Sequence, residues 1–462
     1  MYISKVTIKN YRIFKSDKEY EINDFNVPDG QNNGKGITII AGENGSGKTT
    51  ILDAISSAMI EYKADSYNAK DINNLNEKTE IKVFSDVPFK VQGTFPNTEY
   101  EFKGISFIGG VRGRGNRSFL QSMSVHDQIF LKVNPDKPKD GSPDLRLSVN
   151  NPFSGKRFND TDVVYLDKNR LFQIKSGTYN ETKFDRLMED FNYQYYKNTD
   201  TIEDLNVYLN ENVKKGKIEN DFLADAIKKF EEISDYKVQL DFINNYQPFD
   251  NARFVTREDN KQILLSGIGS GYEMIFSLLY SYYLSKQNGK KMIILIDEPE
   301  LHLHPKIQEK FIDFLIDISK DVQVIATTHS PIIIKQLLQN EFVKIIIVKK
   351  DCSYSEIGEK KLSYNSANEI NYLAFDFPTE EYHNELYEKL KNQYGSNKSI
   401  KDFDKDFFIS TKGETKSYPW KGNVNEVSLH TFVRNQIHHQ AENGKATVVN
   451  LEKSITDMRS YL

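Results

Sequence analysis

A glycine-rich segment between an apolar run and an amphipathic run constrains the fold of this chain most strongly. Residues 42–49 read GENGSGKT and fit the pattern G-x-x-x-x-G-K-[ST]. The preceding residues 36–41, GITIIA, are typical of a short buried strand, and residues 48–62 carry apolar side chains at helical spacing. A strand, this loop and a helix in that order predict a phosphate-binding loop in an α/β domain.

The residue types in the loop match the chemistry of a nucleoside triphosphate. Glycines let the backbone turn tightly and direct its N–H groups at phosphate oxygens, and the helix N-terminus adds a favourable dipole. Lys48 is expected to reach the β- and γ-phosphates, and Thr49 is expected to ligate Mg²⁺. The residues expected to bind the nucleotide are Gly42, Asn44, Gly45, Ser46, Gly47, Lys48, Thr49 and Thr50.

Residues 292–305, MIILIDEPELHLHP, supply the acidic residues that such a loop requires. The apolar strand ends at Asp297, which is expected to hold Mg²⁺, and Glu298 is placed to orient or deprotonate the attacking water. His302 and His304 stand at alternate positions beside these carboxylates, so a transition-metal site is one interpretation. The other is a turn whose histidines contact the nucleotide or a neighbouring subunit.

A second apolar run, VQVIATTHSP at residues 322–331, ends near His329. A histidine at this place can hydrogen-bond a γ-phosphate and sense its presence. A structural histidine is the alternative. Because the phosphate loop and the acidic strand are already present, we favour the functional role.

A Ser/Gly-rich turn opens a long apolar helix within residues 264–284, LLSGIGSGYEMIFSLLYSYYL. Such a turn can present backbone N–H groups and a Ser hydroxyl to phosphate. The nucleotide in the chain's own phosphate loop already has a cradle, so we expect this turn to face the nucleotide of another copy. We take Ser270 and Gly271 as the contacting residues rather than residues 266–267; an N-cap and a simple loop are the alternative.

The segments GENGSGKTT, IGSGYE, LIDEPELHLHP and TTHSP, in that order, resemble the ATP-binding-cassette (ABC) ATPases of the SMC, RecF and OLD-like group. The resemblance covers residues 1–60 and 260–350. It implies an α/β, ABC-type P-loop ATPase head with a parallel or mixed sheet flanked by helices. It also implies ATP and Mg²⁺ as cofactors, and a head-to-tail homodimer, or a higher oligomer, that sandwiches two ATPs.

In that arrangement the resemblance gives each catalytic residue a role. Ser270 and Gly271 act in trans on the partner's ATP, Glu298 is the hydrolytic base and His329 is the switch histidine. Two features depart from the family pattern: Tyr272 stands before the glutamate of the signature, and the Q-loop glutamine has only residues 121 and 128 as candidates. The departures imply slow hydrolysis, or ATP acting mainly as a conformational ligand.

The patterns divide the chain into four segments. Residues 1–184 and 251–350 are expected to form the two halves of the ATPase head, and residues 185–250 a short helical arm insertion. Residues 351–462 are expected to form a mainly helical interaction domain.

Two tail segments, residues 368–390 and 429–443, resemble the C-terminal region of the ATPase subunit of Septu-type anti-phage systems. That resemblance implies a defence ATPase that controls a separate HNH nuclease, with nucleic acid reached through that partner. The acidic run at residues 402–406 lacks the preceding strand of a Toprim nuclease, so we expect a solvated charged turn. Arg434 and His439 match the R-x4-H spacing of HEPN ribonucleases; a docking helix is the favoured alternative.

Composition limits the other classes of function. The net charge of −5 disfavours direct nucleic-acid binding over the whole surface, although the arginine-containing segment 107–119 could contact phosphates or acidic protein. Cys352 is the only cysteine, and no apolar run reaches the length of a membrane span, so we expect a cytoplasmic protein without a disulfide. A RecF-like repair ATPase that binds DNA itself is the second interpretation, and a HEPN-like ribonuclease the third.

Overall fold

The computed structural model describes residues 1–60, 69–92, 99–111, 123–132, 161–167, 222–234, 238–242, 252–256, 262–264, 270–420 and 423–462. The chain divides into two compact units. The first unit contains residues Met1–Ile40, Asn44–His329 and Asn340–Tyr354. The second unit contains residues Ala41–Glu43, Ser330–Gln339 and Ser355–Leu462.

A six-stranded sheet, in the order β14-β13-β3-β12-β11-β7, carries the phosphate loop. Its strands are β3 (Ile37–Ala41), β7 (Thr161–Leu166), β11 (Lys291–Asp297), β12 (Val322–Thr327), β13 (Lys344–Val348) and β14 (Tyr354–Glu356). The strands β7, β11, β12 and β3 run parallel. All of β3 and β12, and all but the first residue of β11, are buried, as continuous apolar runs in central parallel strands require.

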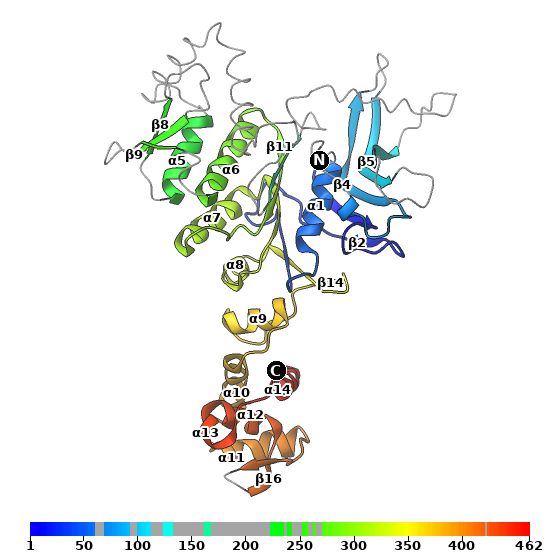
Figure 1. Ribbon diagram of the computed structural model, residues 1–462. Coiled ribbons are helices and arrows are strands. Elements are labelled where there is room, and N and C mark those ends of the chain that lie inside the picture. Colours follow the sequence, from blue (N-terminus) through cyan, green and yellow to red (C-terminus); the bar gives the residue numbers. More distant parts are fainter. Residues whose placement is uncertain are drawn as a thin grey trace. The chain divides into compact units, whose positions relative to one another are not determined.

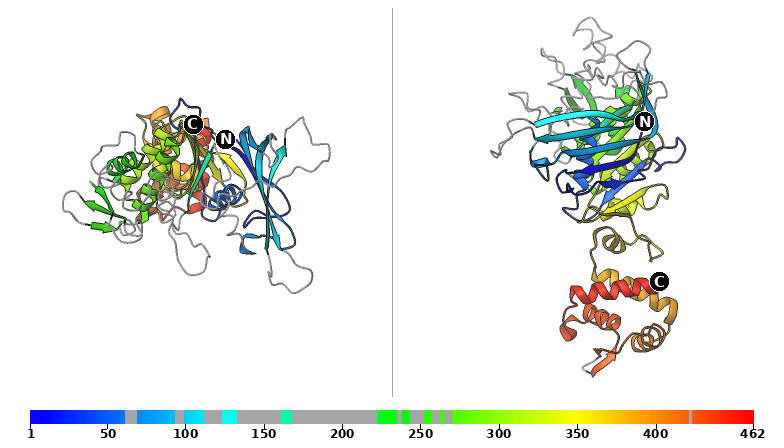
Figure 2. Two further views of the ribbon diagram at one scale, coloured as in Figure 1. Left: turned by 90° about the horizontal axis from the view of Figure 1, so that it is seen from above. Right: turned by 90° about the vertical axis from the view of Figure 1, so that its right-hand side faces the viewer.

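An antiparallel sheet, in the order β2-β1-β4-β5-β6, forms a second layer of the first unit. Its strands are β1 (Ile3–Lys9), β2 (Tyr20–Ile22), β4 (Thr79–Gln92), β5 (Glu99–Val111) and β6 (Met123–Lys132), with a 3₁₀ turn at Ala69–Asp71. Helix α1 (Lys48–Met59) contacts β4 and β5 of this sheet and β11 and β12 of the parallel sheet. It therefore lies between the two sheets (Figures 1 and 2), and one hydrophobic core joins all three layers.

Three helices lie on the other side of the parallel sheet from α1 (Figure 1). They are α5 (Phe222–Ser234), α6 (Ser270–Gln287) and α7 (Pro305–Ile318). Helix α6 contacts β7 and β11, and α5 packs on α6 and α7. Strands β8 (Val238–Phe242), β9 (Ala252–Thr256) and β10 (Gln262–Leu264) form a small antiparallel sheet in the order β10-β9-β8.

The second unit is mainly helical. Its helices are α8 (Pro331–Leu337), α9 (Ala367–Phe375), α10 (Glu380–Gly395), α11 (Ile400–Phe403), a π-helix (Asp404–Thr411), α12 (Leu429–His438), α13 (Gln440–Asn443) and α14 (Val448–Tyr461), with a hairpin of β15 (Tyr418–Trp420) and β16 (Asn423–Val427). A Ser or Thr side chain caps the N-terminus of α8, α9, α10, α11, α12 and α14, which explains where these helices begin. Aromatic side chains dominate its core, including Tyr382, Tyr387, Phe403 and Phe408.

The expected α/β head with flanking helices and a helical C-terminal region is confirmed. Three local expectations are wrong. Residues 238–242 form a strand although the segment was expected to be helical, and β4 and β5 have 14 and 13 residues where short strands were expected. The acidic run 402–406 is helical, and Asp404 is buried because its carboxylate accepts hydrogen bonds from the N–H and hydroxyl of Ser428, the N-cap of α12.

Candidate nucleotide-hydrolysis site

The glycines of the phosphate loop have backbone conformations that other residues rarely adopt. The φ angles of Gly42, Gly45 and Gly47 are 140°, 79° and 98°. A Cβ atom on Gly47 would also lie 2.3 Å from Cδ1 of Ile13, so this glycine is required on two grounds. Helix α1 begins directly after it, and its N-terminus carries backbone N–H groups without helical partners.

The polar side chains of the loop are largely buried. Lys48 is only 4% exposed, and Ser46 is fully buried. The Ser46 hydroxyl makes no hydrogen bond to any described residue. A buried hydroxyl without a partner is costly, so this loop is suited to a polar ligand such as phosphate.

Strand register places Asp297 beside the phosphate loop. Asp297 of β11 pairs with Thr327 of β12, and Thr327 pairs with Ile40 at the end of β3. The Thr49 hydroxyl lies 3.0 Å from both carboxylate oxygens of Asp297, and the Thr327 hydroxyl donates to one of them at 2.5 Å. The two residues expected to hold Mg²⁺ are therefore in contact.

The donor set of Thr49 and Asp297 fits Mg²⁺. Ligand distances of 2.0–2.1 Å place neighbouring ligands of an octahedral Mg²⁺ about 3 Å apart. The hydroxyl and carboxylate are separated by that distance. Burial raises the pKa of Asp297, while its hydrogen bonds with Thr327 and Thr49 act in the opposite direction. A divalent cation would also favour the charged carboxylate.

Glu298 and His329 face each other across the ends of β11 and β12. His329 Nε2 lies 3.7 Å from Glu298 Oε1, and the two side chains are 32% and 19% exposed. Glu298 has a φ of 52°, and its N–H bonds both the carbonyl and the hydroxyl of Thr327. This turn directs Glu298 away from the strand while leaving it accessible to water, as an attacking water requires.

Glu300 is part of the site although the sequence analysis assigned it no role. One of its oxygens accepts hydrogen bonds from the Thr328 hydroxyl and the His329 N–H, both at 2.8 Å. Burial raises its pKa, and its second oxygen makes no hydrogen bond to a described residue. Glu300 therefore fixes the loop that carries His329. The only signal for it was a second acid after the acidic strand.

A buried ion-pair network on α1 was also missed. The Arg12 guanidinium contacts Asp53 of α1 and donates to Asp71 at 2.8 Å. The Tyr165 hydroxyl of β7 donates to Asp53 at 2.8 Å. Since α1 follows the phosphate loop directly, this network holds the loop's supporting helix against neighbouring elements. Its members lie far apart in the sequence, so no local pattern indicates it.

Helix α6 begins at Ser270, the register preferred from the sequence. A Cβ atom on Gly271 would lie 2.6 Å from the carbonyl oxygen of His302. The glycine therefore allows α6 to approach the loop after β11 in the same chain. The competing residues 266–267 lie outside the described residues.

The histidines after β11 lie at the surface. His304 is the N-cap of α7, and its Nδ1 accepts a hydrogen bond from the Lys306 N–H at 3.3 Å. Neither His302 nor His304 belongs to a metal-compatible group of His, Cys, Asp and Glu within the described part of the chain. The structure therefore favours the turn interpretation over a metal site.

The tail residues with the R-x4-H spacing have different surroundings. Arg434 stacks over the ring of Tyr387 at 5.8 Å and donates to Asn435, while His439 is exposed at the end of α12. Arg112, Arg114 and Arg117 of the segment 107–119, Arg170 and Gln121 lie outside the described residues, and the Gln128 side chain is likewise not described. None of the described helices is both long and apolar enough to span a membrane.

Three curated proteins are similar to this chain. A protein named "Retron Vc95 probable ATPase" from Vibrio cholerae is 25% identical over 68% of this chain and 69% of its own length. An OLD nuclease from Thermus scotoductus is 24% identical over 76% of this chain, and Septu protein PtuA from Bacillus mycoides is 24% identical over 75%. The matches span 62% and 40% of these two relatives, so the chain covers less than two thirds of each.

A family model also matches residues 37–335, which include the phosphate loop, the acidic strand and His329. Its description is "AAA domain, putative AbiEii toxin, Type IV TA system". The matched region covers more than half of the chain and coincides with the site whose geometry is described above. The chain therefore belongs to this AAA domain family and is an ATPase.

Proposed function

We propose that this ATPase is a subunit of a bacterial anti-phage defence complex and that ATP controls a separate nuclease, of HNH type. The observation that carries the ATPase part is the contact of Thr49 with Asp297 beside the pair of Glu298 and His329. The similarity to a retron ATPase and to Septu protein PtuA supports the defence part. The resemblance of residues 368–390 and 429–443 to Septu ATPase subunits supports the partner.

The residues of the site divide the chemistry between them. The phosphate loop and Lys48 bind the triphosphate, and Thr49 and Asp297 are placed to hold Mg²⁺, which when bound neutralises phosphate charge. Glu298 accepts the proton of the attacking water. His329 is placed to donate a hydrogen bond to the γ-phosphate, and Glu300 keeps its backbone in position.

A second copy of the chain completes the site in this proposal. Ser270 and Gly271 at the start of α6 present a helix N-terminus to the ATP of the partner, in a head-to-tail homodimer or a higher oligomer. Gly271 also touches the loop that follows Glu298 and Glu300 in its own chain. Binding of the partner's ATP can therefore be transmitted to the chain's own catalytic loop. The proposed head halves, residues 1–184 and 251–350, each supply part of this site.

Phage protection tests the proposal. Bacteria carrying the native locus are challenged with phage, with Lys48→Ala and Glu298→Gln introduced in turn. We expect both variants to lose protection by at least about 100-fold in plaque counts, the order expected for loss of a catalytic group. Lys320→Ala and Glu341→Gln, at exposed positions of the first unit, are the matched controls. Full protection by both Lys48→Ala and Glu298→Gln would sink the proposal, provided that both proteins are produced at wild-type levels.

A further inference from the structure

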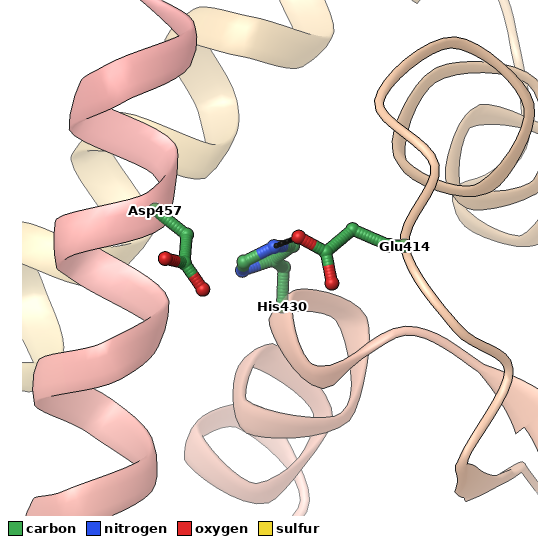
Figure 3. Close-up of side chains that lie close together, drawn as sticks. All are labelled: Glu414, His430 and Asp457. Carbon is green, nitrogen blue, oxygen red and sulfur yellow. Dashed lines mark ion pairs between the residues drawn. The ribbon is translucent and has the colours of Figure 1, made fainter.

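We propose that Glu414, His430 and Asp457 bind a divalent transition-metal ion, with Zn²⁺ as the best fit. The three residues come from separate segments of the second unit: the loop after the π-helix, the first turn of α12, and α14. One ligand atom from each lies within 4.8 Å of the others. Figure 3 shows the His430 ring between the two carboxylates.

The buried imidazole provides the strongest indication of a ligand. His430 is fully buried, and its Nδ1 lies 2.8 Å from the Ser454 hydroxyl. Its Nε2 lies 3.4 Å from Glu414 Oε1 but makes no hydrogen bond to any described residue. Buried polar atoms are rarely left without a partner, so a metal ion at Nε2 would satisfy this nitrogen.

The surroundings of His430 hold its ring in one orientation. The Ser454 hydroxyl lies 2.9 Å from Nε2 of His383 as well, so it is fixed between two buried imidazoles. The ring of Phe408 lies 4.6 Å from that of His430. Hydrogen bonding of the second ring nitrogen is the usual way in which proteins orient a metal-ligating histidine.

The two carboxylates complete a plausible set of donors for zinc. The Tyr461 hydroxyl donates to Glu414, which fixes that carboxylate, and Asp457 lies at the partly exposed edge of the cluster. Zinc ligands at 2.0–2.2 Å lie about 3.3 Å apart, so both carboxylates must rotate inward by about 1 Å. Three protein ligands leave one position for water, and the imidazole disfavours Mg²⁺, which prefers oxygen.

A metal at this place would join three segments that are far apart in the chain. It would link the π-helix loop and α12 to α14, the final helix described. The expected effect is stabilisation of the second unit. This inference does not depend on the proposed defence function.

Metal titration of the full chain tests the inference. The nucleotide-free protein is stripped with EDTA, freed of chelator, and titrated calorimetrically with ZnCl₂, MnCl₂ and MgCl₂. We expect one Zn²⁺ per chain, weaker Mn²⁺ binding and no measurable Mg²⁺ binding. Asp457→Asn should lower the Zn²⁺ affinity at least about tenfold, because removal of a ligand costs no less than removal of its hydrogen-bond partner. Glu452→Gln, an exposed position on the same helix, should bind Zn²⁺ as the wild type does.

A stability readout separates metal binding from a merely structural ion pair. Trp420, the only tryptophan, lies in the second unit, so its fluorescence follows unfolding of that unit. Zn²⁺ should raise the melting temperature of the wild type and of Glu452→Gln, but not that of Asp457→Asn or Glu414→Gln. Absence of stoichiometric Zn²⁺, or equal binding by all four proteins, would overturn the inference and leave His430 and Glu414 as an ion pair.

Discussion

At the scale of single residues, the catalytic loop depends on Glu300 as much as on the residues that the sequence singles out. Thr49, Asp297, Glu298 and His329 follow from the motifs, and their contacts agree with the expected arrangement. Glu300 could not be predicted, since its role comes from two hydrogen bonds to the loop after a neighbouring strand. Those bonds exist only in the folded sheet.

Removal of the Glu300 carboxylate should therefore impair both stability and turnover. Glu300→Ala leaves the buried Thr328 hydroxyl and His329 N–H without this acceptor, at a cost of about 1–3 kcal/mol each. Glu300→Gln keeps an oxygen for both donors and places its amide where the second oxygen has no partner. Urea unfolding and steady-state ATPase assays should show a large loss for Glu300→Ala and a small one for Glu300→Gln. Equal loss in both variants would contradict the role as an acceptor.

At the scale of elements, the strongly patterned segments were predicted and the weakly patterned ones were not. The buried runs of β3, β11 and β12 and the apolar stripes of α1, α5 and α7 agree closely with expectation. Strand β8 was missed because a short strand of a small sheet has little pattern of its own. The cluster of Glu414, His430 and Asp457 was missed because its members meet only through tertiary packing.

The close approach of α6 to the loop after β11 gives a prediction for Gly271. Glycine to alanine at an exposed helix site usually stabilises by about 0.5–1 kcal/mol. Here the new Cβ would lie 2.6 Å from the His302 carbonyl oxygen and from the Leu303 side chain, so the loop must move. We expect Gly271→Ala to lower ATP turnover at least about tenfold, since small displacements of catalytic groups are costly.

The control for this variant is Gln287→Ala, an exposed position at the end of the same helix. Circular dichroism should show the same helix content in both variants and the wild type. Full ATP turnover by Gly271→Ala would show that the contact between α6 and the loop does not position the catalytic residues.

At the scale of the whole molecule, the two units should differ in their response to acid. His383 is fully buried in the second unit, and burial lowers its pKa to about 3. The unfolded histidine, with a pKa near ~6.5, takes up a proton before the folded one does. The second unit therefore loses stability as the pH falls from about 6.5 toward 3, by up to about 1.4 kcal/mol per pH unit.

Urea unfolding followed by Trp420 fluorescence in metal-free buffer measures this dependence. The wild type should lose stability across that pH range, and His383→Gln should lose less per pH unit, whatever its stability at neutral pH. Identical slopes for the two proteins would show that another group is responsible. His430 is retained in both proteins, so its titration does not distinguish them.

The central claim is that two copies of the chain sandwich ATP and hydrolyse it with Glu298. The most direct measurement is steady-state ATPase activity of the purified wild type and Glu298→Gln, with mass photometry of both in the presence and absence of ATP and Mg²⁺. We expect the wild type to hydrolyse ATP, and the variant to be at least about 100-fold slower and to accumulate a larger assembly with ATP. Equal hydrolysis by both proteins, or an assembly state that does not respond to nucleotide, would contradict the claim.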